Sequence, residues 1–133
     1  MRRLRESGFT LIEIMVVIVI IGILLALLLP NMVRSKHQGQ LASCEHSLRA
    51  IASAMENYNT QYKQYPDSLK KLMEDKYVQQ VFCPSNNSEY GLELAADGKD
   101  YTLFCQGSHH LVLGDLVAEG FPQYSGAAGL FRK

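Results

Sequence analysis

The sequence has no tryptophan, no low-complexity tract and no internal repeat, and it carries no excess of charge of either sign. Its 13 Lys and Arg balance 13 Asp and Glu, so the formal net charge is zero. A protein that binds nucleic acid through the phosphates usually presents a basic surface, and this balance argues against such a partner. At 133 residues the chain has room for one small domain plus a membrane segment.

Catalytic motifs are missing as well. The sequence contains no nucleophile elbow, no phosphate-binding loop and no His-Glu-x-x-His helix. The acids Asp97, Asp100, Asp115 and Glu119 are scattered over the last third of the chain and do not form the pattern of a calcium loop. We therefore expect a protein that is not an enzyme and that holds no cofactor and no metal.

One long apolar segment stands out. From Phe9 to Leu29 there are 21 residues, and only Thr10 and Glu13 among them carry a polar side chain. A helix of this length rises roughly 30 Å, which is the thickness of the hydrocarbon core of a bilayer. An acid inside such a helix is costly, so Glu13 is a candidate functional residue.

The residues that flank the segment indicate its topology. Arg2, Arg3 and Arg5 precede it, and the positive-inside rule places this end in the cytoplasm and the rest of the chain outside. A cleaved secretory signal would need a small-x-small site after the apolar run, and the residues 28–31 offer none. The small residue is instead Gly8, before the run.

Residues 8–13 read Gly-Phe-Thr-Leu-Ile-Glu. This hexapeptide, followed by an apolar helix, resembles the amino-terminal motif of type IV pilins and pseudopilins without a mismatch. Gly22 and Pro30 also match that family in their spacing. The resemblance covers residues 1 to about 60 firmly and the remainder only in outline.

The resemblance implies how the chain is processed and assembled. Residues 1–8 would be a leader that a prepilin peptidase cuts between Gly8 and Phe9, and the same enzyme would methylate the new Phe9 amine. The product would wait in the inner membrane until pilus or secretion machinery polymerises it into a helical filament. We expect a subunit of a type IV pilus-like filament. The alternatives are a type II secretion pseudopilin in a periplasmic filament, a minor pilin that binds DNA or surfaces, and an envelope protein that never polymerises.

Glu13, Gly22 and Pro30 are the candidate assembly residues. Pairing of the Glu13 carboxylate with the Phe9 ammonium of a neighbouring subunit would offset its cost in lipid and fix the register of neighbours; the alternative is a side chain that snorkels to the headgroups. Gly22 and Pro30 bracket a stretch that in the family can lose helical hydrogen bonds in the filament. Proline is otherwise simply tolerated in membrane helices.

After Pro30 the apolar pattern narrows to a stripe. Its members recur every seven residues with a second set offset by three: Leu41, Leu48, Met55 and Tyr62, with Cys44, Ile51 and Tyr58. This spacing predicts one helix over residues 9–62, bent or weakened near Gly22 and Pro30, whose outer half packs on a head. We therefore divide the chain into a leader at 1–8, a membrane and filament-core helix at 9–30, an amphipathic half at 31–62 and a head at 63–133.

The head is expected to be a small antiparallel sheet, which gives an α+β, pilin-like fold. Asp67 would cap a short helix that ends near Asp75. Strands are predicted at 89–94, 101–105 and 109–113, with an Asp-Gly hairpin turn between the first two. The segment 114–133 would cover the sheet loosely or form a mobile tail.

Three cysteines in an exported chain suggest one disulfide and one spare thiol. Cys83 and Cys105 flank the first hairpin and are the expected pair, while Cys44 lies on the helix stripe as a buried thiol. Pairing of Cys44 with either of them stays open. A zinc site of Cys83, Cys105, His109 and His110 is the alternative, and we set it aside because neighbouring residues of a strand point to opposite faces.

Overall fold

The computed structural model describes residues 8–133, and the first seven residues of the predicted leader lie outside the described part. The longest element is helix α1, Leu11–Tyr62, which continues through Gly22 and Pro30. The contacts divide the chain after Val33 into an amino-terminal unit and a head that begins at Arg34. The single long helix that the stripe predicted is confirmed, and the two units are described in turn.

In the amino-terminal unit, the apolar residues of α1 have no packing partner among residues 8–133. The large apolar side chains from Leu11 to Leu29 are 46% to 78% exposed. Of the helices that the structure describes, α1 alone is long and apolar enough to cross a membrane. A surface that is apolar all round needs lipid or other subunits to cover it.

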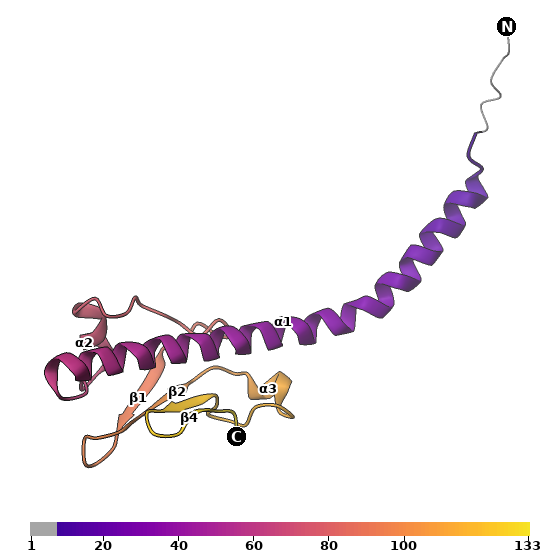
Figure 1. The fold of residues 1–133 in the computed structure, drawn as a ribbon. Coiled ribbons are helices and arrows are strands. Elements are labelled where there is room, and N and C mark those ends of the chain that lie inside the picture. Colours follow the sequence, from indigo (N-terminus) through magenta and orange to yellow (C-terminus); the bar gives the residue numbers. More distant parts are fainter. Residues whose placement is uncertain (1–7) are drawn as a thin grey trace, which may run out of the picture. The chain divides into compact units, whose positions relative to one another are not determined.

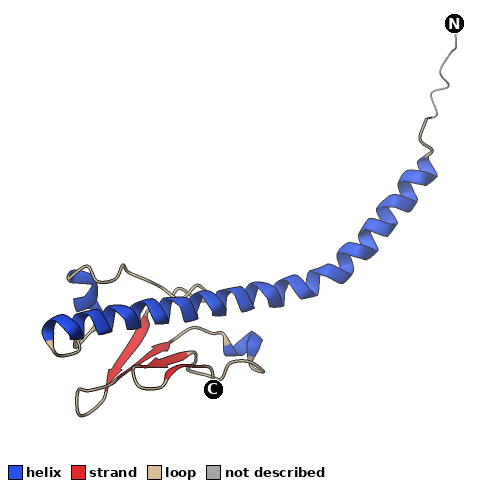
Figure 2. Cartoon of the chain, viewed as in Figure 1, coloured by secondary structure: helices blue, strands red, loops and turns tan. Residues whose placement is uncertain are grey.

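The head combines the outer part of α1 with a four-stranded antiparallel sheet (Figures 1 and 2). Strands β1 (Tyr90–Leu94), β2 (Tyr101–Cys105), β3 (Gln123–Ser125) and β4 (Gly129–Phe131) follow one another in sequence order across the sheet. The sheet lies along one side of the helix (Figure 1). This arrangement confirms the α+β, pilin-like fold class.

The core of the head is the predicted helix stripe packed on the sheet. Leu48 and Met55 are fully buried, and their cluster includes Tyr101 and Leu103 of β2. Of the seven stripe residues only Tyr62, at the end of α1, is exposed. The periodic spacing of apolar residues was therefore a sound guide to which face of α1 packs against the head.

The first hairpin forms where the sequence predicted it. β1 pairs with β2 in a register that places Tyr90 opposite Cys105 and Leu94 opposite Tyr101. Gly98 in the turn has φ +66°, a conformation that glycine adopts without strain, and the Asp97 carboxylate accepts a hydrogen bond from the Lys99 N–H.

The short helix α2, Leu69–Glu74, begins later than expected. Its N-cap is Ser68, not Asp67, and the Ser68 side chain makes no capping hydrogen bond. Pro66 is buried and Leu72 is fully buried, whereas Asp67 is exposed. Packing against the core sets this boundary, so the capping preference of Asp67 did not decide it.

Two expectations for the second half of the head are wrong. The predicted strand 109–113 is a turn of helix, α3 (His110–Leu113), because His109 and Leu113 are both buried while Leu111 and Val112 are exposed. That spacing of four follows helical periodicity rather than the alternation of a strand. Leu113 packs with Leu41 of α1 in a second, smaller core cluster.

The segment 114–133 is also not a loose tail, because it supplies β3 and β4. The Asp100 carboxylate organises their turn by accepting hydrogen bonds from the Ser125 hydroxyl at 3.1 Å and the Ala127 N–H at 3.2 Å. Near the end of the segment, the Arg132 guanidinium binds the buried Glu45 carboxylate of α1 through two hydrogen bonds of 2.6 and 3.1 Å. The glycines and Pro122 of this segment favoured the prediction of a loop, although the segment forms an ordered edge of the sheet.

Candidate functional site

The amino-terminal end of α1 contains the first group of candidate residues. Thr10 precedes the helix, and its N–H and hydroxyl both donate to the Glu13 Oε2 atom, at 2.9 and 2.8 Å. The Glu13 N–H in turn lies 3.3 Å from the Thr10 hydroxyl oxygen. This reciprocal arrangement is a capping box, which satisfies N–H groups that the first turn of a helix leaves free.

The capping box explains the local role of both polar residues in the apolar segment. Only the Oε2 atom of Glu13 is engaged, and within residues 8–133 the Oε1 atom has no hydrogen-bond partner. Gly8 and Phe9 are exposed just before the helix, with Phe9 79% exposed. Cleavage between them, methylation of Phe9 and intersubunit pairing of Glu13 stay predictions.

Gly22 and Pro30 both lie inside the continuous helix. A Cβ atom built on Gly22 would meet nothing within 4 Å, so packing within the described chain does not require glycine there. Their suggested role in loosening the helix during assembly stays a prediction.

The head contains a second group of candidate residues, a buried cluster of three thiols and an imidazole. The predicted disulfide partners are close, with 3.4 Å between the Cys83 and Cys105 Sγ atoms. A disulfide bond is about 2.05 Å long, and all three cysteines carry free thiols in the structure. The Cys83–Cys105 disulfide therefore stays a prediction.

Cys44 and His109 complete this cluster. The His109 Nε2 atom lies 3.2 Å from the Cys83 Sγ atom. The possible ligand atoms of Cys44, Cys83, Cys105 and His109 all lie within 4.8 Å of one another, and all four residues are buried. They come from α1, the loop before β1, the end of β2 and the residue before α3.

The surroundings raise the pKa of two of these thiols, Cys83 and Cys105. A hydrogen bond with Cys44 and burial raise the pKa of Cys105 to about 12. Burial raises the pKa of Cys83, although the backbone N–H groups of Ser85 and Asn86 act in the opposite direction. A metal ion that bound these sulfurs would displace their protons to solvent.

The zinc alternative considered from the sequence contains three members of this cluster, Cys83, Cys105 and His109, and differs in having His110 in place of Cys44. Cys44 lies 39 residues before Cys83 on the helix stripe, and the sequence predicts a buried thiol there, with pairing to Cys83 or Cys105 left open. The predicted strand at 109–113 and the lack of a compact ligand spacing argued against a zinc site, and the strand is replaced by α3 in the structure. The Cys105-x-x-x-His109 spacing was the signal that could have been used, since ligands separated by two to four residues are common in zinc sites.

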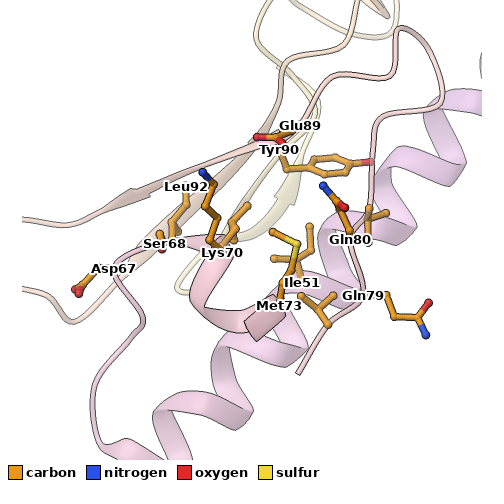
Figure 3. Close-up of a pocket in the computed structure, with 13 residues that line it drawn as sticks. Ile51, Asp67, Ser68, Lys70, Met73, Gln79, Gln80, Glu89, Tyr90 and Leu92 are labelled. Carbon is orange, nitrogen blue, oxygen red and sulfur yellow. The ribbon is translucent and has the colours of Figure 1, made fainter. Parts of the chain in front are cut away.

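The head also contains a groove. It has a volume of about 390 Å³ and lies between α1, α2 and β1, as Figure 3 shows. Its lining mixes apolar side chains with a few charged ones: Ile51, Asp67, Ser68, Leu69, Lys70, Met73, Val78, Gln79, Gln80, Val81, Glu89, Tyr90 and Leu92. No group of converging ligands is present among these residues.

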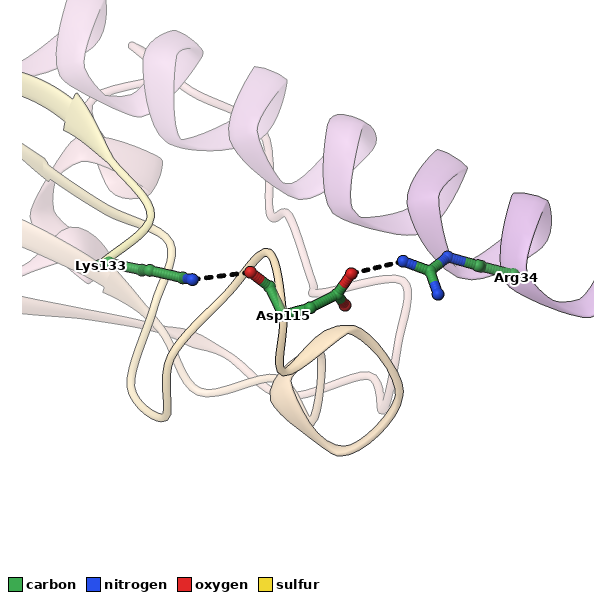
Figure 4. Close-up of polar contacts among 3 residues, drawn as sticks. All are labelled: Arg34, Asp115 and Lys133. Atoms are coloured by element: carbon green, nitrogen blue, oxygen red, sulfur yellow. Dashed lines mark hydrogen bonds and ion pairs between the residues drawn. The ribbon is translucent and has the colours of Figure 1, made fainter.

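An exposed polar network joins the start of the head to its end (Figure 4). The Arg34 guanidinium lies 2.5 Å from the Asp115 carboxylate, and the Lys133 ammonium donates to the Asp115 carbonyl oxygen at 2.6 Å. The hydrogen bond with Arg34 holds the pKa of Asp115 below its usual value. Both partners are more than half exposed, so this network contributes modestly to stability.

Comparison with known proteins agrees with these features. The family described as "Prokaryotic N-terminal methylation motif" matches residues 3–29. The chain is 34% identical over 121 residues to the type II secretion system core protein G of Escherichia coli, which covers 87% of this chain and 82% of that protein.

Two other relatives have different names. The competence protein ComGC of Halalkalibacterium halodurans is 31% identical over 80 residues, covering 60% of this chain and 78% of that protein. The type IV major pilin protein PilA of Myxococcus xanthus is 29% identical over 96 residues, covering 72% of this chain and 40% of that protein. No solved structure matches.

The amino-terminal motif, the long helix with its small sheet and the resemblance along most of the chain agree with one another. The chain therefore belongs to the type IV pilin and type II secretion pseudopilin family, as a structural subunit of the prepilin type.

Proposed function

We propose that this chain is a core pseudopilin of a type II secretion-like apparatus. The observation that carries the proposal is the extent of the resemblance to core protein G, which includes the head and covers 82% of that relative. The match to PilA covers only 40% of that pilin. A pilus subunit is the second candidate, because the match to PilA still extends over 72% of this chain.

The proposed processing follows from the amino-terminal residues. A prepilin peptidase cuts between Gly8 and Phe9 and methylates the Phe9 amine, and the chain is its substrate rather than an enzyme. Exposure of Gly8 and Phe9 outside α1 supports this, since a protease needs an extended, accessible segment.

The proposed orientation places residues 1–8 in the cytoplasm and the head outside. Arg2, Arg3 and Arg5 supply the positive charge on the cytoplasmic side. The apolar helix anchors the subunit in the inner membrane until the assembly machinery moves it into a filament, where neighbouring helices replace lipid around it.

Glu13 sets the register of that assembly. Its Oε2 atom already caps α1 through Thr10, and its Oε1 atom, which has no partner within residues 8–133, would accept a hydrogen bond from the Phe9 ammonium of the next subunit. A charge-assisted hydrogen bond of this kind is short and directional. The carboxylate thus has one role within the subunit and a second between subunits.

The test is the intact mass of the protein in two fractions of its native cells, surface-sheared material and washed envelopes. The proposal predicts a species of residues 9–133 plus one methyl group that stays in the envelope fraction. The same mass in sheared filaments would show a pilus subunit instead. A full-length mass in both fractions would refute the processing.

A further inference from the structure

We propose that Cys44, Cys83, Cys105 and His109 form a structural binding site for one divalent zinc ion in the head. The donor set is three sulfurs and one imidazole nitrogen, which is one of the standard tetrahedral ligand sets of zinc. The argument uses the head alone and does not depend on which filament the subunit enters.

The distances between the donor atoms suit one central ion. Sulfurs about 2.3 Å from zinc at the corners of a tetrahedron are separated by about 3.8 Å, and a nitrogen ligand is slightly closer. The Cys83 and Cys105 sulfurs are 3.4 Å apart, and the His109 Nε2 atom is 3.2 Å from the Cys83 sulfur. All four donors fall within 4.8 Å of one another, so small side-chain rotations would complete the tetrahedron.

The backbone around the cluster is arranged as it would be around metal-bound thiolates. The Gly107 N–H donates to the Cys105 sulfur at 3.3 Å. Hydrogen bonds of this type orient the ligands of a metal and partly neutralise their charge.

Gly107 shows that the loop is fitted closely to the cluster. A Cβ atom at this position would lie 2.4 Å from the Cys83 sulfur and 3.0 Å from the His109 Nε2 atom. No other residue could bring the backbone this close to two of the donors. The glycine is therefore required by the cluster rather than by the turn alone.

An unpartnered hydroxyl provides an independent observation. The Tyr90 hydroxyl is buried, its residue belongs to the same core cluster as Cys44, and by geometry it has no hydrogen-bond partner among the residues that the structure describes. A buried hydroxyl without a partner is costly. A Cys44 thiolate on zinc would be an acceptor for this donor.

A disulfide accounts for less of the arrangement. A bond between Cys83 and Cys105 would use two of the donors and leave a buried thiol and a buried imidazole beside it without a role. A zinc ion uses all four. Because every ligand is buried and no coordination position stays open, the site would be structural, and it would join α1 to the loops on either side of the first hairpin.

The test is the metal content of the full-length protein, purified in detergent from its native membranes without added metal or chelator. Elemental analysis should find about one zinc per chain, and denaturing mass spectrometry should find three free thiols. A chelator should remove the zinc and lower the midpoint of thermal unfolding by about 10 °C or more. A chain without metal whose mass is two hydrogens lower would contain a disulfide and would overturn the proposal.

Three variants test His109 as a ligand. His109→Asn should lose the zinc, and His109→Cys should keep it, because a fourth thiolate is an equally good ligand. His46→Asn is the matched control, since His46 is exposed on α1 and lies outside the cluster. If His109→Asn does not fold, Co²⁺ added to the metal-free natural protein gives a second readout. Intense sulfur-to-cobalt charge-transfer bands are expected, and their absence would contradict the site.

Discussion

The two halves of α1 are parts of one helix, yet their surroundings are opposite. From Leu11 to Leu29 the large apolar side chains are all exposed, whereas Leu48 and Met55 in the outer half are fully buried. The inner half is apolar all round and the outer half has a single apolar stripe. The width of the apolar surface thus indicates whether a helix finds its partner outside its own chain or within it.

Blocking the cleavage of the leader that precedes the inner half of α1 should have the largest effect. Replacement of Gly8 by leucine, Gly8→Leu, should abolish cleavage, because the bulky side chain would occupy the position that the peptidase recognises. The uncut chain would keep its leader and could not expose an ammonium at Phe9. The measurement is the mobility of the protein on a gel, and a product of normal size would refute the proposed cleavage site.

Removal of the charge at Glu13 should have the next largest effect. Hydrogen bonds to charged groups contribute about 1.5–3 kcal/mol, so Glu13→Ala should reduce assembly by roughly tenfold or more while cleavage continues. Glu13→Gln is the sharper variant, since glutamine can maintain the capping box but has no charge. Normal filament yield from Glu13→Gln would mean that capping of α1, and not pairing with Phe9, is the role of this residue.

A pair of truncations tests the contrast between the two halves directly. Leu48→Ala should lower the free energy of unfolding of the head by about 2–5 kcal/mol, because it leaves a cavity in the core. Ile18→Ala, in the inner half, should change it by less than about 0.5 kcal/mol. Urea unfolding of both full-length proteins in the same detergent, followed by tyrosine circular dichroism, measures this. Equal losses would contradict the division of α1 into two environments.

The ion pair between Arg132, which follows β4, and Glu45 of α1 should have a smaller effect. Arg132→Ala leaves the Glu45 carboxylate, only 7% exposed, without its two hydrogen bonds. We expect a loss of about 1–3 kcal/mol in the free energy of unfolding. The control is Arg49→Ala, which removes an exposed arginine from α1, the helix that carries Glu45. Similar losses from both variants would show that Glu45 does not depend on Arg132.

The smallest predicted effect is the pH dependence of the Arg34–Asp115 pair. Because the pKa of Asp115 is lowered in the folded state, its stabilisation is fully present above the ordinary aspartate value of about 3.9. It is lost as the pH falls through the lowered pKa. The unfolding midpoint of Asp115→Asn should therefore lie slightly below that of the natural protein at neutral pH and converge with it in acid. A constant difference across the range would exclude this ion pair as the cause.

The parts of the structure that the sequence predicted have strong local signals. The stripe from Leu41 to Tyr58 repeats often enough to identify a buried helix face, and the Asp97-Gly98 turn determines the hairpin. The strand prediction at 109–113 was wrong because five residues are too few to distinguish the periodicity of a helix from that of a strand. Strands β3 and β4 have three residues each, and their order depends on Asp100 and Glu45, which lie far away in the sequence.

The two candidate sites differ in the same way. Gly8, Phe9 and Glu13 are contiguous, so a short motif was enough to propose their roles. The thiol and imidazole cluster depends on a helix residue, Cys44, that meets Cys83 and Cys105 only after the head has folded. The sequence allows a zinc site that includes Cys83, Cys105 and His109, but no spacing rule brings the distant Cys44 to it, and only the folded head shows that Cys44 is the fourth member.

The burial pattern of α1 also determines where this protein can be shortened for biochemical work. A fragment that began after Tyr62 would have the whole sheet but would lack half of its core, including Leu48, Met55 and Cys44. A fragment that began at Arg34 would keep the core, the Arg34–Asp115 ion pair and the thiol cluster. It would omit the exposed apolar surface of the inner half of α1. Crystallisation trials and nuclear magnetic resonance of the head should start from that second boundary.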